Sequence, residues 1–246
     1  LNNSSFGGAV GYDHALNLTT RIGGLFSYGQ THYDTDNING NSHDWRFGLY
    51  ADHKRGDWDF QGLVSYGQNH YDIDRSVAWD SSTSNGDYKA KVVDAELKAK
   101  YLIPSTAART WQVRPYGKVS YTHNNQEAYG ETGDSIFKQS INSTSNNSWR
   151  GEIGAEFKRD FKNQTGYGGT IGYKRVFSGL NPELNGSFAD GSNFIISTDN
   201  DRNFVTYSLN AHGKLGPKWV GQLEFSGEAG GHSHKEIYSA VVKYSF

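Results

Sequence analysis

The sequence predicts an all-β fold: a single transmembrane antiparallel up-and-down β-barrel of 12 strands, about 11 of them visible in residues 1–246. Apolar and polar residues alternate with a period of two along most of the chain, as is typical of strands with one apolar and one polar face. Tryptophans gather near the starts of the alternating segments, and the connections between segments alternate in length. Together these features indicate a barrel with lipid outside and water inside.

The composition excludes several other classes of protein. No stretch of ~18 consecutive apolar residues is present, so we expect no membrane-spanning helix. Cysteine is absent, which removes disulfides, cysteine-ligated metals and thiol catalysis. The net charge of -2 gives no electrostatic reason to expect nucleic acid as a partner. Aromatic residues make up 14% of a chain whose mean hydropathy is -0.73, and this aromatic content argues against disorder.

The alternating segments are each about as long as a tilted strand that crosses a bilayer, ~9–11 residues or slightly more. In the segment 148–159, for example, Trp149, Ile153 and Phe157 share one phase, whereas Glu152 lies on the other. A soluble sandwich also alternates, but its apolar face is filled with bulky Val, Ile and Leu, not with this mixture rich in Gly and Ala. The segments are residues 6–16, 19–32, 43–53, 58–71, 90–103, 111–123, 148–159, 166–176, 204–215, 219–229 and 235–246.

The polar phase predicts a wet lumen lined by charges of both signs. Twelve strands spaced ~4.8 Å apart and tilted by ~40° give a backbone diameter of ~24 Å. Inward side chains then leave about 10–12 Å, the width of one α-helix. Such a lining can hydrogen-bond a polypeptide without holding it in one strong field. The expected lumen-lining residues are Arg46, Asp94, Glu96, Lys98, Lys100, Arg114, Lys118, Arg150, Glu152, Glu156, Lys174, Glu224, Glu228 and Lys243.

Tryptophans and connections indicate where the bilayer lies. The expected aromatic girdle consists of Trp45, Trp58, Trp111, Trp149 and Trp219, each near the first residue of a segment and on its apolar phase. Short and longer connections alternate along the chain. The short ones are 14–18, 54–57, 104–110, 160–165 and 215–218, and the longer ones are 33–42, 72–89, 124–147, 177–203 and 228–234. This rhythm predicts an integral protein of the bacterial outer membrane, in contact with its lipids, with long loops at the cell surface and a periplasmic C-terminus.

The strand count carries a further expectation. A periplasmic C-terminus and eleven segments put Leu1 at the outer surface. Single-chain bacterial barrels have an even number of strands because both of their ends lie in the periplasm. We therefore expect one further strand before Leu1, absent from this chain or supplied by a separate piece.

Five stretches of the chain carry a family resemblance. They are Gly-Leu-Phe-Ser-Tyr-Gly-Gln at 24–30, Trp-Arg-Phe-Gly-Leu-Tyr-Ala at 45–51 with the turn 54–58, Val-Arg-Pro-Tyr-Gly-Lys-Val-Ser-Tyr at 113–121, the loop 181–188 and the closing segment 236–246. In order and spacing these stretches resemble the β-domain, or translocator domain, of monomeric type V autotransporters, along nearly the whole chain.

The resemblance implies a pore and anchor that exports an N-terminal passenger, with no enzymatic activity, cofactor or metal. It implies a monomer whose lumen is crossed by the passenger's linker or helix, and insertion by the outer-membrane barrel assembly machinery. That machinery recognises the last strand, in which Tyr244 and Phe246 match the aromatic positions of the assembly signal and Val241 replaces the usual Gly. The family's first strand and luminal helix have no counterpart here, so the missing N-terminal strand is an expected partner.

Two other functions stay open at this point. One is a 12-stranded diffusion channel for small solutes. The other is an outer-membrane hydrolase, which changes at Asp134, Ser135 or His212 would test. Gly133 to Ile136 is similar to the nucleophile block of one class of esterases, but no downstream Asp-x-x-His follows it. His232 and His234 could share a metal ion, yet without a third ligand a solvated pair in a loop is the better interpretation.

Overall fold

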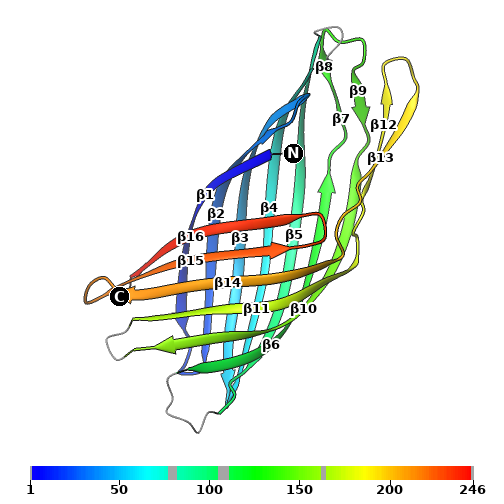
Figure 1. Ribbon diagram of the computed structural model, residues 1–246. Coiled ribbons are helices and arrows are strands. Elements are labelled where there is room, and N and C mark those ends of the chain that lie inside the picture. Colours follow the sequence, from blue (N-terminus) through cyan, green and yellow to red (C-terminus); the bar gives the residue numbers. More distant parts are fainter. Residues whose placement is uncertain (1, 77–81, 105–110, 162–164, 245–246) are drawn as a thin grey trace.

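The computed structural model describes residues 2–76, 82–104, 111–161 and 165–244 as β-strands joined by turns and loops (Figure 1). The main sheet is antiparallel. In order across the sheet its path is β1 (Asn2–Ala15), β2 (Thr20–Asp34), β3 (Ile38–Arg55), β4 (Trp58–Ser76), β5 (Thr83–Tyr101), β6 (Gln112–Gln126), β10 (Thr144–Asp160), β11 (Gly166–Ser178), β14 (Asn203–Lys214), β15 (Trp219–Ala229) and β16 (His234–Tyr244). Within the described residues, no helix has the length and apolar composition needed to cross a membrane.

Each predicted segment is confirmed as one strand of this path, but several strands are longer than predicted. β4 and β5 have 19 residues each, and the connection expected at 33–42 shrinks to 35–37. The reason is that the apolar alternation ends where the apolar band ends, whereas the backbone ladder continues through polar residues. On the opposite side the connection expected at 104–110 begins at Leu102, where β5 has ended.

The two longest connections contain short strands that the alternation in the sequence does not predict. β8 (Thr132–Gly133) adds to the edge of β5, and β7 (Tyr129–Gly130), β9 (Gln139–Ile141), β12 (Glu183–Phe188) and β13 (Asn193–Ser197) form a second sheet in the order β13-β12-β9-β7. Figure 1 shows this second sheet at the end of the main sheet opposite the C-terminus. Strands of two to six residues are too short to give a recognisable alternation.

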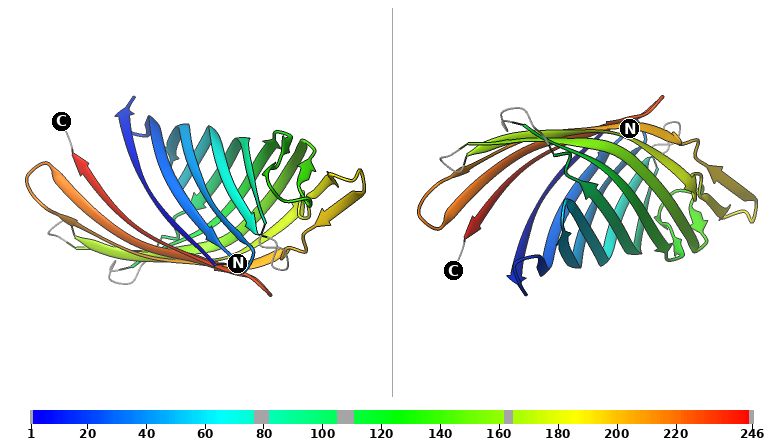
Figure 2. Two further views of the ribbon diagram at one scale, coloured as in Figure 1. Left: turned by 90° about the horizontal axis from the view of Figure 1, so that it is seen from above. Right: turned by 90° about the horizontal axis from the view of Figure 1, so that it is seen from below.

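The main sheet curls strongly along its path, so that it encloses a concave face (Figure 2). The two ends of the path, β1 and β16, are not joined by a ladder in the described part of the chain. The curled sheet therefore has an open seam between its edge strands.

Large apolar side chains are exposed on this molecule instead of gathering in a core. Leu97, Ile153, Leu209 and Leu223 are each 65–68% exposed. The buried apolar side chains among the described residues are Ala90, Val92, Tyr116, Ile141 and Val176. An apolar surface of this extent indicates that the sheet is covered by lipid or by another apolar partner.

Candidate functional site

A cavity of about 610 Å³ extends along the concave face and touches residues from β2 to β15. Only the inside of a curled sheet can bring so many strands to one cavity. A second cavity of about 400 Å³ lies nearer the end where β5 and β16 finish. The first is bordered by Arg46, Asp94, Glu96, Lys98, Lys118, Arg150, Glu152, Lys174, Glu224 and Glu228, and the second by Lys100, Arg114, Glu156 and Lys243.

Glu152 on β10 is buried in this wall, and its carboxylate is well partnered. Its side chain is 7% exposed. The Tyr116 hydroxyl donates a hydrogen bond of 2.6 Å to Oε1, and the Thr206 hydroxyl donates one of 3.0 Å to the same oxygen. Lys118 Nζ lies 2.8 Å from Oε2. A buried carboxylate needs such partners because desolvation strongly disfavours an unpaired charge.

Two glycines make room for the Tyr116 hydroxyl. Gly154 and Gly172 are directly opposite each other on β10 and β11. A Cβ atom on either glycine would lie 2.6 Å from the Tyr116 hydroxyl oxygen. Glycine inside a strand often marks such a close approach. The sequence shows these glycines, but it does not show that they accommodate a side chain from β6.

A second group of polar contacts links β3, β5 and β6. Arg46 Nη1 donates a hydrogen bond of 2.7 Å to Asp94 Oδ2, and the Thr122 hydroxyl donates one of 2.6 Å to Asp94 Oδ1. Arg150 of β10 donates to the Thr122 hydroxyl oxygen. The charges on β3, β5 and β10 are thus joined through Asp94 and the Thr122 hydroxyl of β6.

Glu156 carries a similar cluster further along β10. Its carboxylate lies 3.4 Å from Lys100 Nζ and 3.7 Å from Arg114 Nη1. Lys100 Nζ is in turn 3.7 Å from Asp59. The concave face is therefore charged but largely self-neutralised, which agrees with a lining that exerts no single strong field. Further pairs on this face are Lys174 with Glu228 and Lys118 with Glu96.

The convex face carries aromatic residues at two levels. At one level the ring centroids of Trp58 and Tyr101 are 5.1 Å apart. At the other level those of Trp45 and Tyr66 are 5.6 Å apart. Trp111 pairs with Tyr167 and Trp219 with Tyr244 at the first level, and Trp149 with Tyr121 at the second. The five tryptophans are 36–48% exposed.

The spacing of the two levels matches a bilayer. On β4 the step from Trp58 to Tyr66 covers ~26 Å along the strand at ~3.3 Å per residue, or ~20 Å along the barrel axis at a tilt of ~40°. Outer-membrane barrels carry an apolar band of ~25 Å between their aromatic girdles. Trp45 and Trp149 lie well inside β3 and β10, not at their first residues, because these strands extend beyond the apolar band.

A stack of tyrosines lies beyond the second aromatic level, on the concave side of the sheet. The ring centroids of Tyr71 and Tyr88 are 4.8 Å apart, and those of Tyr88 and Tyr129 are 4.5 Å apart. Burial raises the pKa of the Tyr88 hydroxyl. Tyr129 belongs to the long connection that follows β6, so the stack attaches this connection to β4 and β5. No local pattern predicts this stack, because its members come from separate segments of the chain.

An ion pair strengthens the same attachment. Arg75 donates hydrogen bonds of 2.9 and 2.6 Å to the two carboxylate oxygens of Glu131, and one of 2.7 Å to the Phe137 carbonyl. The two side chains are 17% and 7% exposed. Bidentate pairing of this kind fixes the relative orientation of the two side chains and makes their interaction stronger.

The residues considered for hydrolysis are held in different surroundings. Ser135 is fully buried, and its Oγ accepts a hydrogen bond of 3.1 Å from the Phe137 N–H. Asp134 accepts one of 3.0 Å from the Thr83 N–H. His212 lies on β14, where it borders the second cavity and its Nε2 is 3.2 Å from Asp160. In these contacts Ser135 and Asp134 stabilise a turn against the start of β5.

The structure also shows where the two loop histidines and the C-terminal strand residues lie. His232 lies 3.3 Å from Asp201 through Nδ1, beside His234 at the start of β16. Tyr244 of the expected assembly signal packs against Trp219 on the convex face. Phe246, its other member, lies outside the described residues. Val241 on β16 is directly opposite Gln222 on β15.

Comparisons with known proteins agree with this geometry. The family model for the autotransporter β-domain matches residues 1–226. A search of the curated proteins found no match. The translocator domain of the autotransporter NalP from Neisseria meningitidis has a similar structure, with a TM-score of 0.83 and 18% identity over 99% of this chain and 80% of that chain.

Two further solved structures share the fold. The β-domain of the Bordetella autotransporter BrkA gives a TM-score of 0.69 and 14% identity, covering 99% of this chain and 91% of that one. The transport unit of the autotransporter AIDA-I from Escherichia coli gives a TM-score of 0.57 and 13% identity, covering 99% of this chain and 82% of that one. The fold expected from the alternation is confirmed, and the family match covers most of the chain. This chain belongs to the autotransporter β-domain family.

Proposed function

We propose that the chain is the outer-membrane translocator domain of an autotransporter, which anchors in the membrane and mediates export of an N-terminal passenger to the cell surface. Membership of the β-domain family supports this function. The domain would act as a pore and anchor, with no catalytic residue of its own. A diffusion channel for small solutes is not favoured, because the chain belongs to the autotransporter β-domain family.

One observation carries the proposal: the polarity of the sheet is inverted relative to a soluble protein. Leu97 and Ile153 are exposed on the convex face, whereas Glu152 is buried on the concave one. Two aromatic levels border the apolar surface, which suits a bilayer of matching thickness. The concave face would then form part of a wet lumen in the membrane.

The self-neutralised lining suits transit of a polypeptide. A chain in the lumen must hydrogen-bond to the wall, because its backbone groups cannot be left unpaired. It must also leave again, so no single contact can be strong. Pairs such as Arg46 with Asp94 keep their charges occupied with each other. They offer a moving chain many weak contacts in place of one deep electrostatic well.

The finer features of the proposal concern topology and partners. The long connections and the second sheet would lie at the cell surface, and the end of β16 would face the periplasm. The last strand, with Tyr244 and Phe246, would be recognised by the outer-membrane barrel assembly machinery. The domain would work as a monomer in outer-membrane lipids. The seam between β1 and β16 is where a strand preceding Leu1 would close the barrel.

Passenger export in cells that express the full precursor tests the proposal. Replacing Glu152 and Glu156 together by Leu adds bulky apolar groups to the lumen, and export should slow several-fold as followed by pulse-chase surface exposure of the passenger. The barrel should stay heat-modifiable on gels, which reports folding. Because Glu152 has structural partners, Glu224→Leu is a second variant. Among the described residues the Glu224 carboxylate accepts one weak hydrogen bond, 3.4 Å long, from Gln222.

Glu183→Leu is the matched control, because Glu183 is exposed on β12 in the second sheet. This change should leave export at the wild-type rate. Export that is unchanged in both lumen variants, with folded barrels at normal levels, would contradict a transit path along the concave face.

A further inference from the structure

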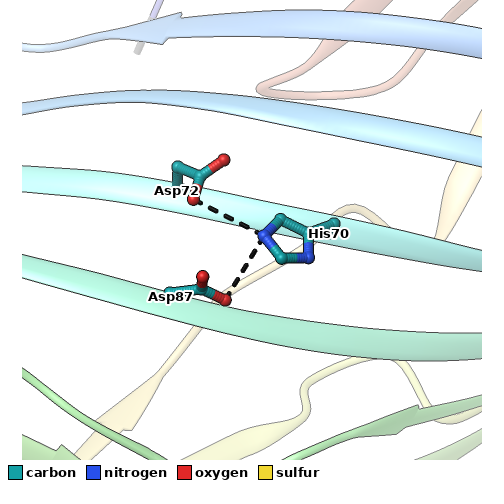
Figure 3. A group of neighbouring side chains, drawn as sticks. All are labelled: His70, Asp72 and Asp87. Carbon is teal, nitrogen blue, oxygen red and sulfur yellow. Dashed lines mark ion pairs between the residues drawn. The ribbon is translucent and has the colours of Figure 1, made fainter.

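Three potential metal ligands converge on the convex side of β4 and β5, beyond the second aromatic level. Figure 3 shows Asp72 and Asp87 on either side of the same ring nitrogen of His70. His70 Nε2 lies 3.5 Å from Asp72 Oδ1 and 3.3 Å from Asp87 Oδ1. One ligand atom from each residue falls within 4.8 Å of the others. The three side chains are 34%, 55% and 66% exposed, so an ion can reach them from solution.

The strand register forces this convergence. Asp72 and Asp87 are directly opposite each other in the β4–β5 ladder. His70 is two residues before Asp72, so the period of two places it on the same face. The neighbouring pair, Tyr71 and Tyr88, stacks on the other face with ring centroids 4.8 Å apart, which holds the register. Like charges directly opposite in a sheet destabilise it unless a cation lies between them.

The distances fit a bound cation better than hydrogen bonds. A charge-assisted N–H···O⁻ bond is ~2.7–2.9 Å long, and both contacts of His70 Nε2 are longer. If the single proton on that nitrogen were shared between both carboxylates, the result would be one bifurcated hydrogen bond with two long arms. Two ligands of a tetrahedral ion with bonds of ~2.0–2.1 Å are ~3.3–3.4 Å apart, which is close to the observed separations.

We propose that His70, Asp72 and Asp87 form a binding site for a Zn²⁺-class divalent cation. Imidazole with carboxylate suits zinc and its first-row neighbours, whereas Ca²⁺ and Mg²⁺ prefer oxygen ligands alone. Three protein ligands leave a fourth position to water, as in open zinc sites. The ion joins β4 to β5 where the two strands extend beyond the apolar band, and stiffens this hairpin. Nothing in this assignment depends on passenger export.

Calorimetric titration of Zn²⁺ into the folded protein in detergent tests the site. We expect one Zn²⁺ per chain bound by this cluster. His70→Ala and Asp87→Asn should each weaken it at least ~10-fold, the loss that even a partner outside the ligand set can cause. Heat-modifiability on gels shows that the variants are folded. Ca²⁺ and Mg²⁺ should bind more weakly than Zn²⁺, and Co²⁺ in the wild type should give a visible absorption band that His70→Ala removes.

His32→Ala and His232→Ala are the matched controls. His32 lies on β2 with its Nδ1 3.0 Å from Asn41, and His232 lies in the loop before β16. Neither change should alter the affinity. The proposal is overturned if the wild type binds no Zn²⁺ at millimolar concentration, if His70→Ala binds as tightly as the wild type, or if Ca²⁺ binds more tightly than Zn²⁺.

Discussion

At the scale of single residues, the concave face depends on hydrogen bonds that satisfy buried charge. Tyr116 reaches from β6 over Gly154 and Gly172 to Glu152, and Lys118 from the same strand pairs with the other carboxylate oxygen. The alternation in the sequence separates the two faces of each strand, because it is a local property. It does not predict which charges pair, because the partners lie on neighbouring strands whose register is set by the whole sheet.

Tyr116→Phe isolates the contribution of one of these bonds. The change removes the 2.6 Å hydrogen bond to Glu152 and keeps the ring. Because hydrogen bonds to charged groups contribute ~1.5–3 kcal/mol, the free energy of unfolding should fall by about that amount in a urea titration of the folded protein in micelles. Tyr121→Phe removes an exposed 2.6 Å bond to Asn147 and should cost less. Equal losses in the two variants would refute a special role for the buried carboxylate.

At the scale of elements, strands and connections differ in how far the sequence determines them. The path from β1 to β16 follows from the alternation, since one face of every strand must be apolar over the width of the bilayer. The second sheet does not: β7 and β9 have two and three residues, and their attachment depends on Tyr129 and Glu131 meeting side chains of distant strands. Contacts between distant segments leave no periodic signal in a sequence.

The connection between β15 and β16 should loosen in acid. Asp201 accepts hydrogen bonds of 2.8 Å from the His232 N–H and 2.7 Å from the Ser233 hydroxyl, and these bonds lower its pKa to about 2. An unfolded Asp has a pKa of ~3.9, so the stabilisation is complete above that pH and is lost as pH falls toward about 2.

Hydrogen exchange of residues 230–233 measures this loss. Protection should be constant from pH 7 down to ~4, after correction for intrinsic exchange, and should fall below that pH. In Asp201→Asn, residues 230–233 should show already at neutral pH the reduced protection that the wild type shows at low pH. The protection of β15 and β16 should be unchanged. A wild-type loop that is equally protected at both ends of the range would rule out Asp201 as the anchor.

At the scale of the whole molecule, the curled sheet separates two solvents. Its convex face carries apolar residues between two aromatic levels, and its concave face carries paired charges around cavities of about 610 and 400 Å³. The curl follows from the twist of many antiparallel strands. Closure by a strand between β1 and β16 stays a prediction, because the two edges are unpaired in the described part of the chain.

Cysteine-scanning accessibility along β10 tests this separation most directly, and the chain has no native cysteine to interfere. Single cysteines at positions 150 to 157, in the folded protein in lipid vesicles, would be treated with a charged, membrane-impermeant thiol reagent. Labelling should follow a period of two. Cysteines that replace Arg150, Glu152 and Glu156 should react through the lumen, and those that replace Ile153, Ala155 and Phe157 should not. Uniform labelling, or the opposite phase, would contradict a barrel with lipid on its convex face and water within.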